Sequence, residues 1–515
     1  MLAKVLSAAV VGLDAVPIEV EVDIASQGLP SFTIVGLPDK AVEEAKERVR
    51  SAIRNSGADF PARRITVNLA PADLPKEGPA YDLPIALGIL LASEQLHTNN
   101  SKNALFIGEL SLDGRLRPIP GVLSQAILAK KKNLTSLFVP EQNAREAAII
   151  NGLAVYPVAT LSSLFYHLNG QAPLKRIDTT SFEDYSNDME FDFDMKDIKG
   201  QEQAKRAMEI AAAGGHNVLL KGPPGAGKTL LARTLPSILP KLTFEEAVEV
   251  TKIYSISGLL AREAVVIKRP FRSPHHTTSL AGLIGGSSHP KPGEISLAHR
   301  GVLFLDEFPE YPRHILEALR QPIEDGFVSI ARAGGRITFP AKCMLIAAQN
   351  PCPCGYLGDK SHECRCLQSQ IIRYQKKISG PILDRIDMHL TIPAVKIEKL
   401  HATTTAKESQ AVESSAPIRQ RVQLARNAQQ KRFKNTQFTS NAEITNKAVK
   451  EFCLLADESA TLLGRAAAQM NLSARSYHRV IKLAQTIADL ESSSTIAPQH
   501  IAEALQYRPR VEFNP

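Results

Sequence analysis

A glycine-rich loop constrains this chain more than any other segment. The loop, Lys221–Thr229 (KGPPGAGKT), follows a short apolar run typical of a buried strand, and helix-forming residues come after it. Strand, glycine-rich turn and helix in this order form a Walker A loop, whose backbone N–H groups turn inward around a phosphate. The predicted nucleotide-binding residues of the loop are Gly222, Pro223, Pro224, Gly225, Ala226, Gly227, Lys228 and Thr229. The sequence therefore predicts a nucleotide site in an α/β domain.

Two side chains of the loop and an acidic pair further along supply the chemistry of an ATPase site. Lys228 is placed to reach the β- and γ-phosphates, and the Thr229 hydroxyl to hold Mg²⁺. Gly301–Glu307 (GVLFLDE) has the pattern of a buried strand that ends in two carboxylates. Asp306 would organise Mg²⁺ through its water shell, and Glu307 would orient and deprotonate the attacking water. The sequence therefore predicts ATP and Mg²⁺ as cofactors, with Thr229 and Asp306 at the metal.

The composition is that of a large enzyme without a membrane span. A chain of 515 residues is expected to hold about three domains, and no apolar stretch approaches the ~18 residues that a span needs. Asp14 and the β-branched alternation that follows it favour a strand over an export signal near the start. We therefore expect a cytoplasmic protein with no membrane partner, whose six cysteines are reduced and available to a metal.

Changes in composition divide the chain into four parts. Residues 1–170 mix short strand and helix patterns, and residues 171–194 read as an acidic linker without a helical or strand period. Residues 195–396 hold the ATPase motifs, and residues 397–515 are helix-patterned after a polar start. Between Ser414 and Ala442 there are six basic residues and no acid. That run fits a solvated helix face and a surface that faces a polyanion equally well.

Four further motifs occur in the order found in AAA+ ATPases, which they resemble. Asp197–Gln201 (DIKGQ) is similar to the box that clasps the nucleotide. Cys343–Asn350 has the pattern of a strand ending in an amide and resembles sensor 1. Ser379–Asp387 (SGPILDRID) resembles the arginine-finger segment of the Mg-chelatase and MCM-helicase branch, and Leu472–Arg475 resembles sensor 2. With the acidic pair, the predicted catalytic residues are Glu307, Asn350, Arg385 and Arg475.

The AAA+ resemblance implies a role for each of these side chains. Asn350 would help to position the hydrolytic water. Arg385 would reach the γ-phosphate held by the neighbouring subunit, a device that raises the rate roughly 10³–10⁵-fold in other NTPases. Arg475 would act at the same site. The arrangement therefore implies a ring of subunits in which neighbours share each ATP site.

A longer resemblance narrows the family. His275–Tyr311 (HHTTSLAGLIGGSSHPKPGEISLAHRGVLFLDEFPEY), with NPCPCGY and CRC further along, is similar to the Mg-chelatase-like bacterial family called YifB or ComM. The similarity covers nearly the whole chain. It implies an α/β fold with an AAA+ P-loop core, an N-terminal Lon-protease-like α+β domain and a C-terminal helical lid. It also implies a homo-hexameric motor, and for ComM a DNA helicase that promotes branch migration during natural transformation.

The N-terminal part resembles Lon protease without its catalytic dyad. Pro75–Ala80 is similar to the segment that carries the Lon serine, and Phe106–Gly121 to the stretch before its lysine. Ala80 occupies the nucleophile position and has no hydroxyl, while Leu123 and Gln125 occupy the positions where the lysine could fall. Because a Ser–Lys dyad needs both groups, we expect no peptidase activity.

Four cysteines are spaced as two close pairs, C-x-C-x₉-C-x-C. Two pairs of thiolates suit a tetrahedral structural Zn²⁺, although this spacing is tighter than the usual x₂₋₄. His362 could replace one thiol, and unliganded reduced cysteines are the alternative. The predicted zinc ligands are Cys352, Cys354, Cys364 and Cys366.

Two segments are expected to face the channel of a ring. The first is the Gly-, Ser- and His-rich stretch between Arg272 and Arg300, which fits the helix-2 insertion of this AAA+ branch. The second is Phe327–Phe339, where alternating runs flank a Gly-Gly turn and predict a β-hairpin. Arg332 and Arg336 flank its tip and are the predicted DNA contacts, through phosphates. A purely structural hairpin with solvated arginines is the alternative.

The combined interpretation is a ring-forming ATPase that translocates on DNA and promotes branch migration in homologous recombination. The competing class is a chaperone-like motor that remodels a protein partner, as Mg-chelatase relatives do with the same core. The basic run and the channel arginines favour DNA, whereas no dedicated DNA-binding motif occurs. An ATP-dependent protease is disfavoured by Ala80.

Overall fold

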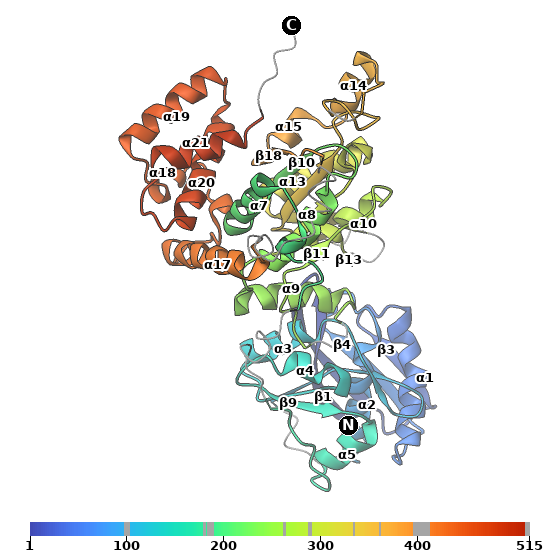
Figure 1. Ribbon diagram of the computed structural model, residues 1–515. Coiled ribbons are helices and arrows are strands. Elements are labelled where there is room, and N and C mark those ends of the chain that lie inside the picture. Colours follow the sequence, from blue (N-terminus) through green and yellow to red (C-terminus); the bar gives the residue numbers. More distant parts are fainter. Residues whose placement is uncertain are drawn as a thin grey trace. The chain divides into compact units, whose positions relative to one another are not determined.

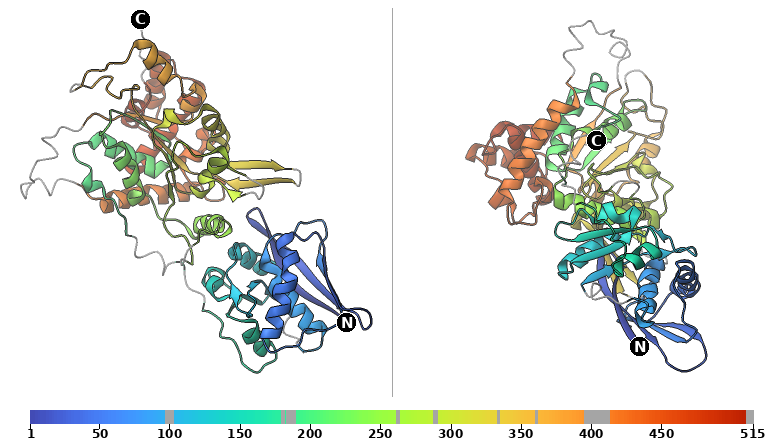
Figure 2. Two further views of the ribbon diagram at one scale, coloured as in Figure 1. Left: turned by 90° about the vertical axis from the view of Figure 1, so that its right-hand side faces the viewer. Right: turned by 90° about the horizontal axis from the view of Figure 1, so that it is seen from below.

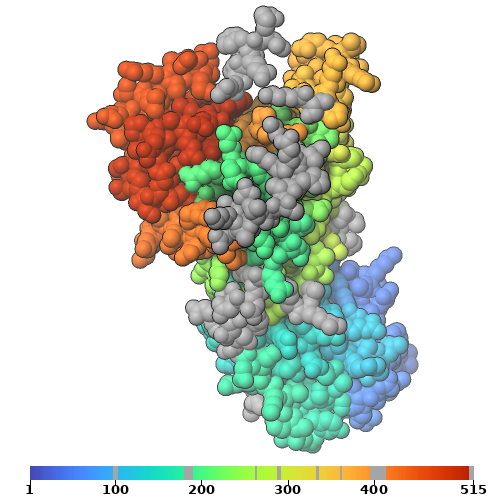
Figure 3. All heavy atoms as spheres, viewed as in Figure 1, coloured from blue at the N-terminus to red at the C-terminus, as the bar shows by residue number. Residues whose placement is uncertain are grey.

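The computed structural model places most of the chain in two compact units. Unit 1 is Met1–Asn187 with Phe244–Ile267, and unit 2 is Asp188–Thr243 with Lys268–Pro515. Figures 1 and 3 show the elements and one surface of each unit. No helix in the described part of the chain is both long and apolar enough to cross a bilayer. The described residues are 1–96, 103–178, 182, 190–260, 264–286, 291–332, 335–359, 362–394 and 413–509, with the backbone alone at 332 and 335.

A four-stranded sheet forms one half of unit 1. Alternate residues of its strands are buried, as the side-chain period of two requires. Helix α2 packs on β1 and β2, and the amphipathic helix α1 packs on α2. In sheet order the strands are β1 (Leu2–Val11), β2 (Asp14–Ile24), β4 (Arg64–Ala70) and β3 (Ser31–Val35); the helices are α1 (Lys40–Asn55) and α2 (Asp82–Ala92).

A three-stranded parallel sheet, β5-β8-β9, forms the other half of unit 1. Helix α3 packs against α9, which comes from the second segment of the unit. Buried Glu146 accepts hydrogen bonds from Ser255 Oγ and, at 2.9 Å, from the Leu123 amide. The elements are β5 (Ala104–Phe106), β6 (Glu109–Leu110), β7 (Leu116–Arg117), α3 (Val122–Lys131), β8 (Ser136–Pro140), α4 (Ala144–Ala147), β9 (Ala154–Val158), α5 (Leu161–Leu168) and α9 (Phe244–Ile256).

Unit 2 is built on a five-stranded, all-parallel sheet in the order β11-β14-β17-β10-β18. The central strand β17 lies between β14 and β10, so the carboxyl ends of all three strands meet at one edge. In an open parallel sheet this edge is where ligands bind. The elements are α7 (Glu202–Gly214), β10 (Val218–Lys221), α8 (Lys228–Thr234), β11 (Phe271–Arg272), β14 (Val302–Leu305), β17 (Met344–Gln349) and β18 (Met388–Thr391).

The C-terminal part of unit 2 is helical, as the sequence predicted. Helices α17 and α20 pack on α7, and one hydrophobic cluster continues from the sheet into these helices. Asp387, which precedes β18, lies 3.6 Å from His216 Nδ1 and forms an ion pair with Arg479 of α20. The helices are α17 (Ser415–Arg432), α18 (Val449–Phe452), α19 (Asp457–Gln469), α20 (Ala474–Leu490) and α21 (Pro498–Gln506).

The predicted β-hairpin is confirmed. Strands β15 (Phe327–Arg332) and β16 (Gly335–Pro340) pair antiparallel, and Figure 2 shows them projecting from unit 2 as an arm. The tip residues Ala333 and Gly334 lie outside the described residues. The remaining elements of unit 2 are α10 (Leu280–Ile284), β12 (Gly285–Gly286), β13 (Lys291–Pro292), α11 (Glu294–Leu297), α12 (Arg313–Ala318), α13 (Arg320–Asp325), α14 (Gln368–Gln375) and α15 (Gly380–Leu383).

Candidate ATPase site

The glycine-rich loop joins β10 to α8, at the carboxyl edge of the parallel sheet. Gly225 (φ 73°) and Gly227 (φ 82°) have left-handed backbone, which glycine adopts without the cost of a Cβ. At Gly222 an added Cβ would lie 2.3 Å from the Ile392 carbonyl oxygen, so a larger residue cannot fit. The loop is therefore held in a form that only this glycine pattern permits.

Lys228 lies among oxygen acceptors where a nucleotide's phosphates would bind. Its Nζ donates hydrogen bonds to the carbonyl oxygens of Gly222 (2.7 Å) and Pro223 (2.9 Å), and to Asn350 Oδ1 (3.1 Å). Burial lowers the pKa of Lys228, and the charge of Asp306 opposes that shift. Neutral carbonyl and amide oxygens compensate a buried cation less well than phosphate does, so an anionic ligand would replace them favourably.

The acidic pair lies at the end of β14, beside Thr229. Thr229 Oγ1 donates to Asp306 Oδ2 at 2.8 Å, which brings together the two predicted Mg²⁺ groups. Hydroxyl and carboxylate oxygens are suitable Mg²⁺ ligands, and the remaining positions are normally filled by water and phosphate. The donor set therefore fits Mg²⁺ delivered with ATP.

Glu307 is presented by an unusual backbone. Its φ of 50° is left-handed, and its amide donates to Asp306 Oδ1 at 2.9 Å. A non-glycine residue in this region is strained and persists only when its surroundings hold it there. The Glu307 side chain is 58% exposed, so water can reach the carboxylate.

His276 is a member of this site that sequence reasoning did not single out. Its Nδ1 lies 3.2 Å from Glu307 Oε2, and its ring lies against that of His275, with centroids 4.1 Å apart. The surrounding stretch was expected to be a channel insertion and to carry the family motif. The adjacent pair of histidines at the start of that motif was the available signal. His276 can orient the carboxylate that is predicted to activate water.

Residues of the predicted sensor 1 and of the predicted nucleotide-clasping box contact the Walker A loop. Asn350 follows β17 and contacts Lys228, where a sensor-1 amide would be expected. Gln201 Nε2 donates to the Ala226 carbonyl oxygen at 2.6 Å, so the predicted clasping box touches the loop backbone.

Arg385 and Arg475 lie together at one carboxylate. Both guanidinium groups contact the carboxylate of Glu324, Arg475 at 3.4 Å. Arg385 Nη1 also donates to the Pro381 carbonyl oxygen at 2.7 Å. Within the described residues neither guanidinium has a hydrogen bond or ion pair to Lys228 or Glu307. Glu324, the carboxylate that joins the two arginines, had no distinguishing sequence signal.

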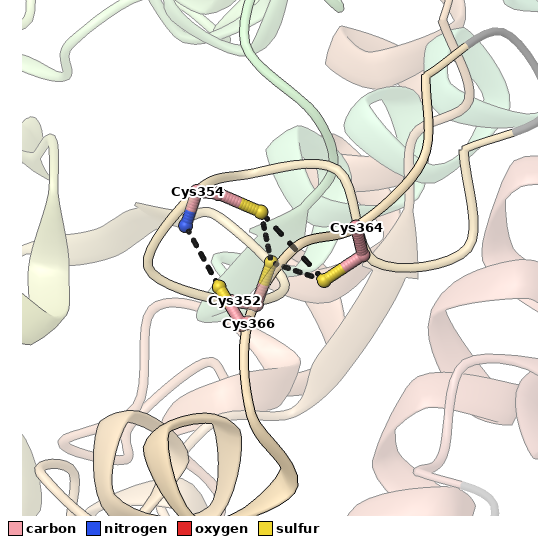
Figure 4. Close-up of side chains that lie close together, drawn as sticks. All are labelled: Cys352, Cys354, Cys364 and Cys366. Atoms are coloured by element: carbon pink, nitrogen blue, oxygen red, sulfur yellow. Dashed lines mark hydrogen bonds between the residues drawn. The ribbon is translucent and has the colours of Figure 1, made fainter.

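The four predicted zinc ligands come together in the loop after Asn350 (Figure 4). The Sγ atoms of Cys352, Cys354 and Cys364 are 3.4–3.7 Å apart, and all four sulfurs lie within 4.8 Å of one another. Four thiolates around Zn²⁺ at ~2.3 Å lie ~3.8 Å apart, so the cluster has the size of a zinc site. Hydrogen bonds from the Tyr356 and Arg365 amides lower the pKa of Cys354 to about 6.

The cysteine loop touches the nucleotide loop. Gly355, with φ 88°, lies against the Walker A loop, and an added Cβ would be 2.6 Å from Pro224 Cδ. Any larger residue at Gly355 would therefore displace one of the two loops. The cysteine cluster lies next to the ATP site and is part of its surroundings.

The predicted DNA contacts can be followed only in part. Arg336 lies on β16, is exposed, and donates from Nε to Ser329 Oγ on the paired strand. The Arg332 side chain lies outside the described residues. In unit 1, Ala80 packs against the hydrophobic cluster that contains Leu123, and Gln125 is buried on the same helix. Ala80 and Leu123, two of the three positions named for a Lon-type dyad, thus belong to one apolar cluster.

Comparisons with known proteins identify the family of the chain. The family model "Magnesium chelatase, subunit ChlI" matches residues 194–400, "Subunit ChlI of Mg-chelatase" matches 20–143, and the C-terminal model of the same subunit matches 412–508. The protein YifB of Escherichia coli is 46% identical over 501 residues, covering 97% of this chain and 96% of its own. Competence protein ComM of Haemophilus influenzae is 45% identical over 516 residues, covering 99% and 98%.

The parallel sheet, the phosphate loop and these matches define a magnesium-chelatase-like protein of the AAA+ class, which implies an ATPase that uses ATP and Mg²⁺. Within that class, the chain belongs to the YifB/ComM family.

Proposed function

We propose that this protein is a cytoplasmic AAA+ motor that assembles as a homo-hexamer, translocates on DNA and promotes branch migration in homologous recombination during natural transformation. One observation carries the proposal: the predicted Walker A, Mg²⁺ and sensor-1 groups contact one another in a chain that matches a competence protein over 99% of its length. Competence requires that incoming DNA be processed, and a ring ATPase can couple hydrolysis to movement along a strand.

Each residue of the site has its own role in ATP hydrolysis. Lys228 and the loop amides bind the phosphates, while Thr229 and Asp306 hold Mg²⁺. Glu307 takes the proton of the attacking water, and Asn350 helps to position that water. Arg385 and Arg475 neutralise the charge that develops on a phosphate bound by the adjacent subunit. Both guanidinium groups are held by Glu324 and not by the predicted catalytic groups, which is compatible with a role across a subunit interface.

We assign the parts of the chain accordingly. Residues 1–170 form a Lon-like domain without peptidase activity, and residues 171–194 a linker. Residues 195–396 form the AAA+ core with the zinc-binding cysteine loop, apart from residues 244–267, which pack with unit 1. Residues 397–515 form the helical lid that carries Arg475. Continuous packing of the C-terminal helices against α7 supports a lid that moves with the core.

Remodelling of a protein partner is the second candidate function. The family models that match are those of a magnesium chelatase subunit. The resemblance to that class implies a motor that uses the AAA+ core to remodel a protein partner. In this alternative the N-terminal unit would hold the partner and the hairpin would contact polypeptide.

Branch migration on a three-strand DNA junction distinguishes the two functions. We expect wild-type protein with ATP to drive branch migration and Lys228→Ala protein to be inactive. The double variant Arg332→Ala/Arg336→Ala should keep its DNA-free ATPase, because the hairpin does not contribute to the nucleotide site, and lose most strand exchange. Thr338→Ala, at an exposed position of the same hairpin, is the matched control. Absence of any unwinding by wild type would favour the protein-remodelling function.

A further inference from the structure

A cleft of about 820 Å³ lies in unit 2 between the segment after Glu307 and helix α14. One wall is residues 309–313, which include the start of α12, and the other runs from Ser369 to Lys377. A cleft of this volume lies in the range of small-ligand sites. It is separate from the Walker A loop, none of whose residues line it.

The cleft is cationic. Arg313, Arg373, Lys376 and Lys377 line it, with Glu310 as the single carboxylate, so the lining carries a net charge of +3. Lys377 Nζ pairs with Glu310 at 2.9 Å. The other three basic side chains are exposed, and Arg313 interacts favourably with the charge of Glu317, which lies outside the lining. Three cations close together repel one another, which an anionic ligand would relieve.

Part of the cleft lining is apolar. Pro309, Pro312 and Ile372 contribute to it, and Ile372 is 39% exposed. Basic and apolar groups in one lining match a nucleic-acid strand whose phosphates meet the cations while sugars and unpaired bases cover the apolar groups. A duplex keeps its bases stacked inside and would offer only phosphates.

We propose that this cleft binds single-stranded nucleic acid through its phosphate backbone, a site distinct from the hairpin. The proposal rests on the proposed function, since it names a second contact for the same DNA. Because no donor and acceptor pattern specific to one base lines the cleft, binding is independent of sequence.

The cleft is also connected to the catalytic groups. Tyr311 lines it, and the Tyr311 hydroxyl donates to the Pro274 carbonyl oxygen at 2.6 Å. Pro274 lies two residues before His276, which contacts Glu307. A nucleic-acid strand bound in the cleft would hold in place the segment that connects the cleft to Glu307. Occupancy of the cleft therefore stimulates ATP hydrolysis.

Fluorescence anisotropy with a labelled oligo(dT) strand, titrated at several salt concentrations, tests the site. The variant is Arg373→Gln/Lys376→Gln, and the matched control is Lys131→Gln/Lys132→Gln, which removes two exposed charges from unit 1. Each phosphate contact to a single strand contributes about 0.7 to the slope of log K against log salt. We expect the variant to lower that slope by about 1.4 and to weaken binding roughly tenfold or more at 0.1 M salt.

The DNA-free ATPase of the variant should equal that of wild type, while stimulation by oligo(dT) should fall; the control should match wild type in both. Unchanged affinity and salt slope in the variant would overturn the cleft assignment, even if wild type migrates branches. An equal loss of duplex binding would overturn the single-strand assignment. Impaired ring assembly in sedimentation, with DNA binding intact, would instead make the cleft a subunit interface. If wild type binds no DNA at all, the proposed function itself fails.

Discussion

Glu307 occupies a strained backbone position with water-accessible oxygens, which suits a general base. We expect Glu307→Gln, which keeps the size of the side chain, to bind ATP normally and to lose about 100-fold or more in turnover. Steady-state ATPase and binding of a fluorescent nucleotide measure the two effects separately. Lys228→Ala is the companion variant and should lose binding itself. Retained turnover in the Glu307→Gln protein would remove this residue from the role of water activator.

His276 should act through Glu307 rather than on the nucleotide. Since its ring lies 3.2 Å from the carboxylate, His276→Ala should lower kcat about tenfold and leave KM for ATP nearly unchanged. His314→Ala, at an exposed position of α12, is the control, because His275 itself packs against the His276 ring. Equal kcat values for the two variants would show that the contact has no part in positioning Glu307.

At the scale of elements, Asp387 joins the parallel sheet to the C-terminal helices. Burial alone would raise the pKa of Asp387, but Arg479, His216 and the Asn217 amide hold it well below its usual range. A carboxyl whose pKa is depressed on folding stabilises the protein above its unfolded-state pKa of ~3.9, and that contribution is lost as the pH falls below it.

Removing the Asp387 charge should lower the free energy of unfolding at neutral pH. Asp387→Asn leaves Arg479 beside a neutral group, and breaking a buried pair costs on the order of 3 kcal/mol. Urea unfolding at pH 7 should show this loss, and the difference from wild type should narrow as the pH is lowered below about 4. Asp384→Asn, at an exposed position three residues away, is the control. A difference that stays constant down to pH 3 would contradict the ionic origin of the effect.

The cysteine loop should carry metal. Four sulfurs at tetrahedral spacing predict about one zinc per chain in protein purified without chelators, measured by elemental analysis. The variant Cys354→Ser should reduce that content, whereas Cys343→Ser, outside the cluster, should not. Because Gly355 contacts the Walker A loop, zinc removal should also weaken nucleotide binding. If zinc-free protein bound ATP with the affinity of zinc-loaded protein, nucleotide binding would not depend on the metal in the cysteine loop.

At the scale of the whole molecule, Arg385 and Arg475, which both contact Glu324, are predicted to complete the ATP site of an adjacent subunit. Arg385→Ala protein should bind ATP and hydrolyse it poorly. Mixing it with Lys228→Ala protein should restore part of the activity, because some interfaces then combine an intact Lys228 site with an intact Arg385. Sedimentation checks that both variants assemble. A mixture that assembles and stays inactive would remove the support for a role across subunits.

What the sequence predicts well is what depends on neighbours in the chain. The strand before Gly222, the acidic pair after Leu305, the hairpin and the cysteine cluster are each encoded in one short run, so local pattern suffices. His276 and Glu324 depend on tertiary contacts with residues 31 and 61 positions away. Neither a histidine nor a glutamate is unusual at these positions. The periodicity of apolar residues along the chain does not show which distant polar residues will meet in the fold.

Unit 1 is discontinuous, and this limits how the protein can be divided. Residues 244–267 belong to unit 1 although both flanking segments belong to unit 2. A fragment ending at residue 187 would therefore lack α9, expose the surface of α3 that α9 covers, and leave the Glu146 carboxylate without the Ser255 hydroxyl. No single cut yields both units intact. Gene fusion or truncation at one junction cannot exchange this N-terminal module. Any such exchange also has to join the chain at the two ends of residues 244–267, inside the sequence of unit 2.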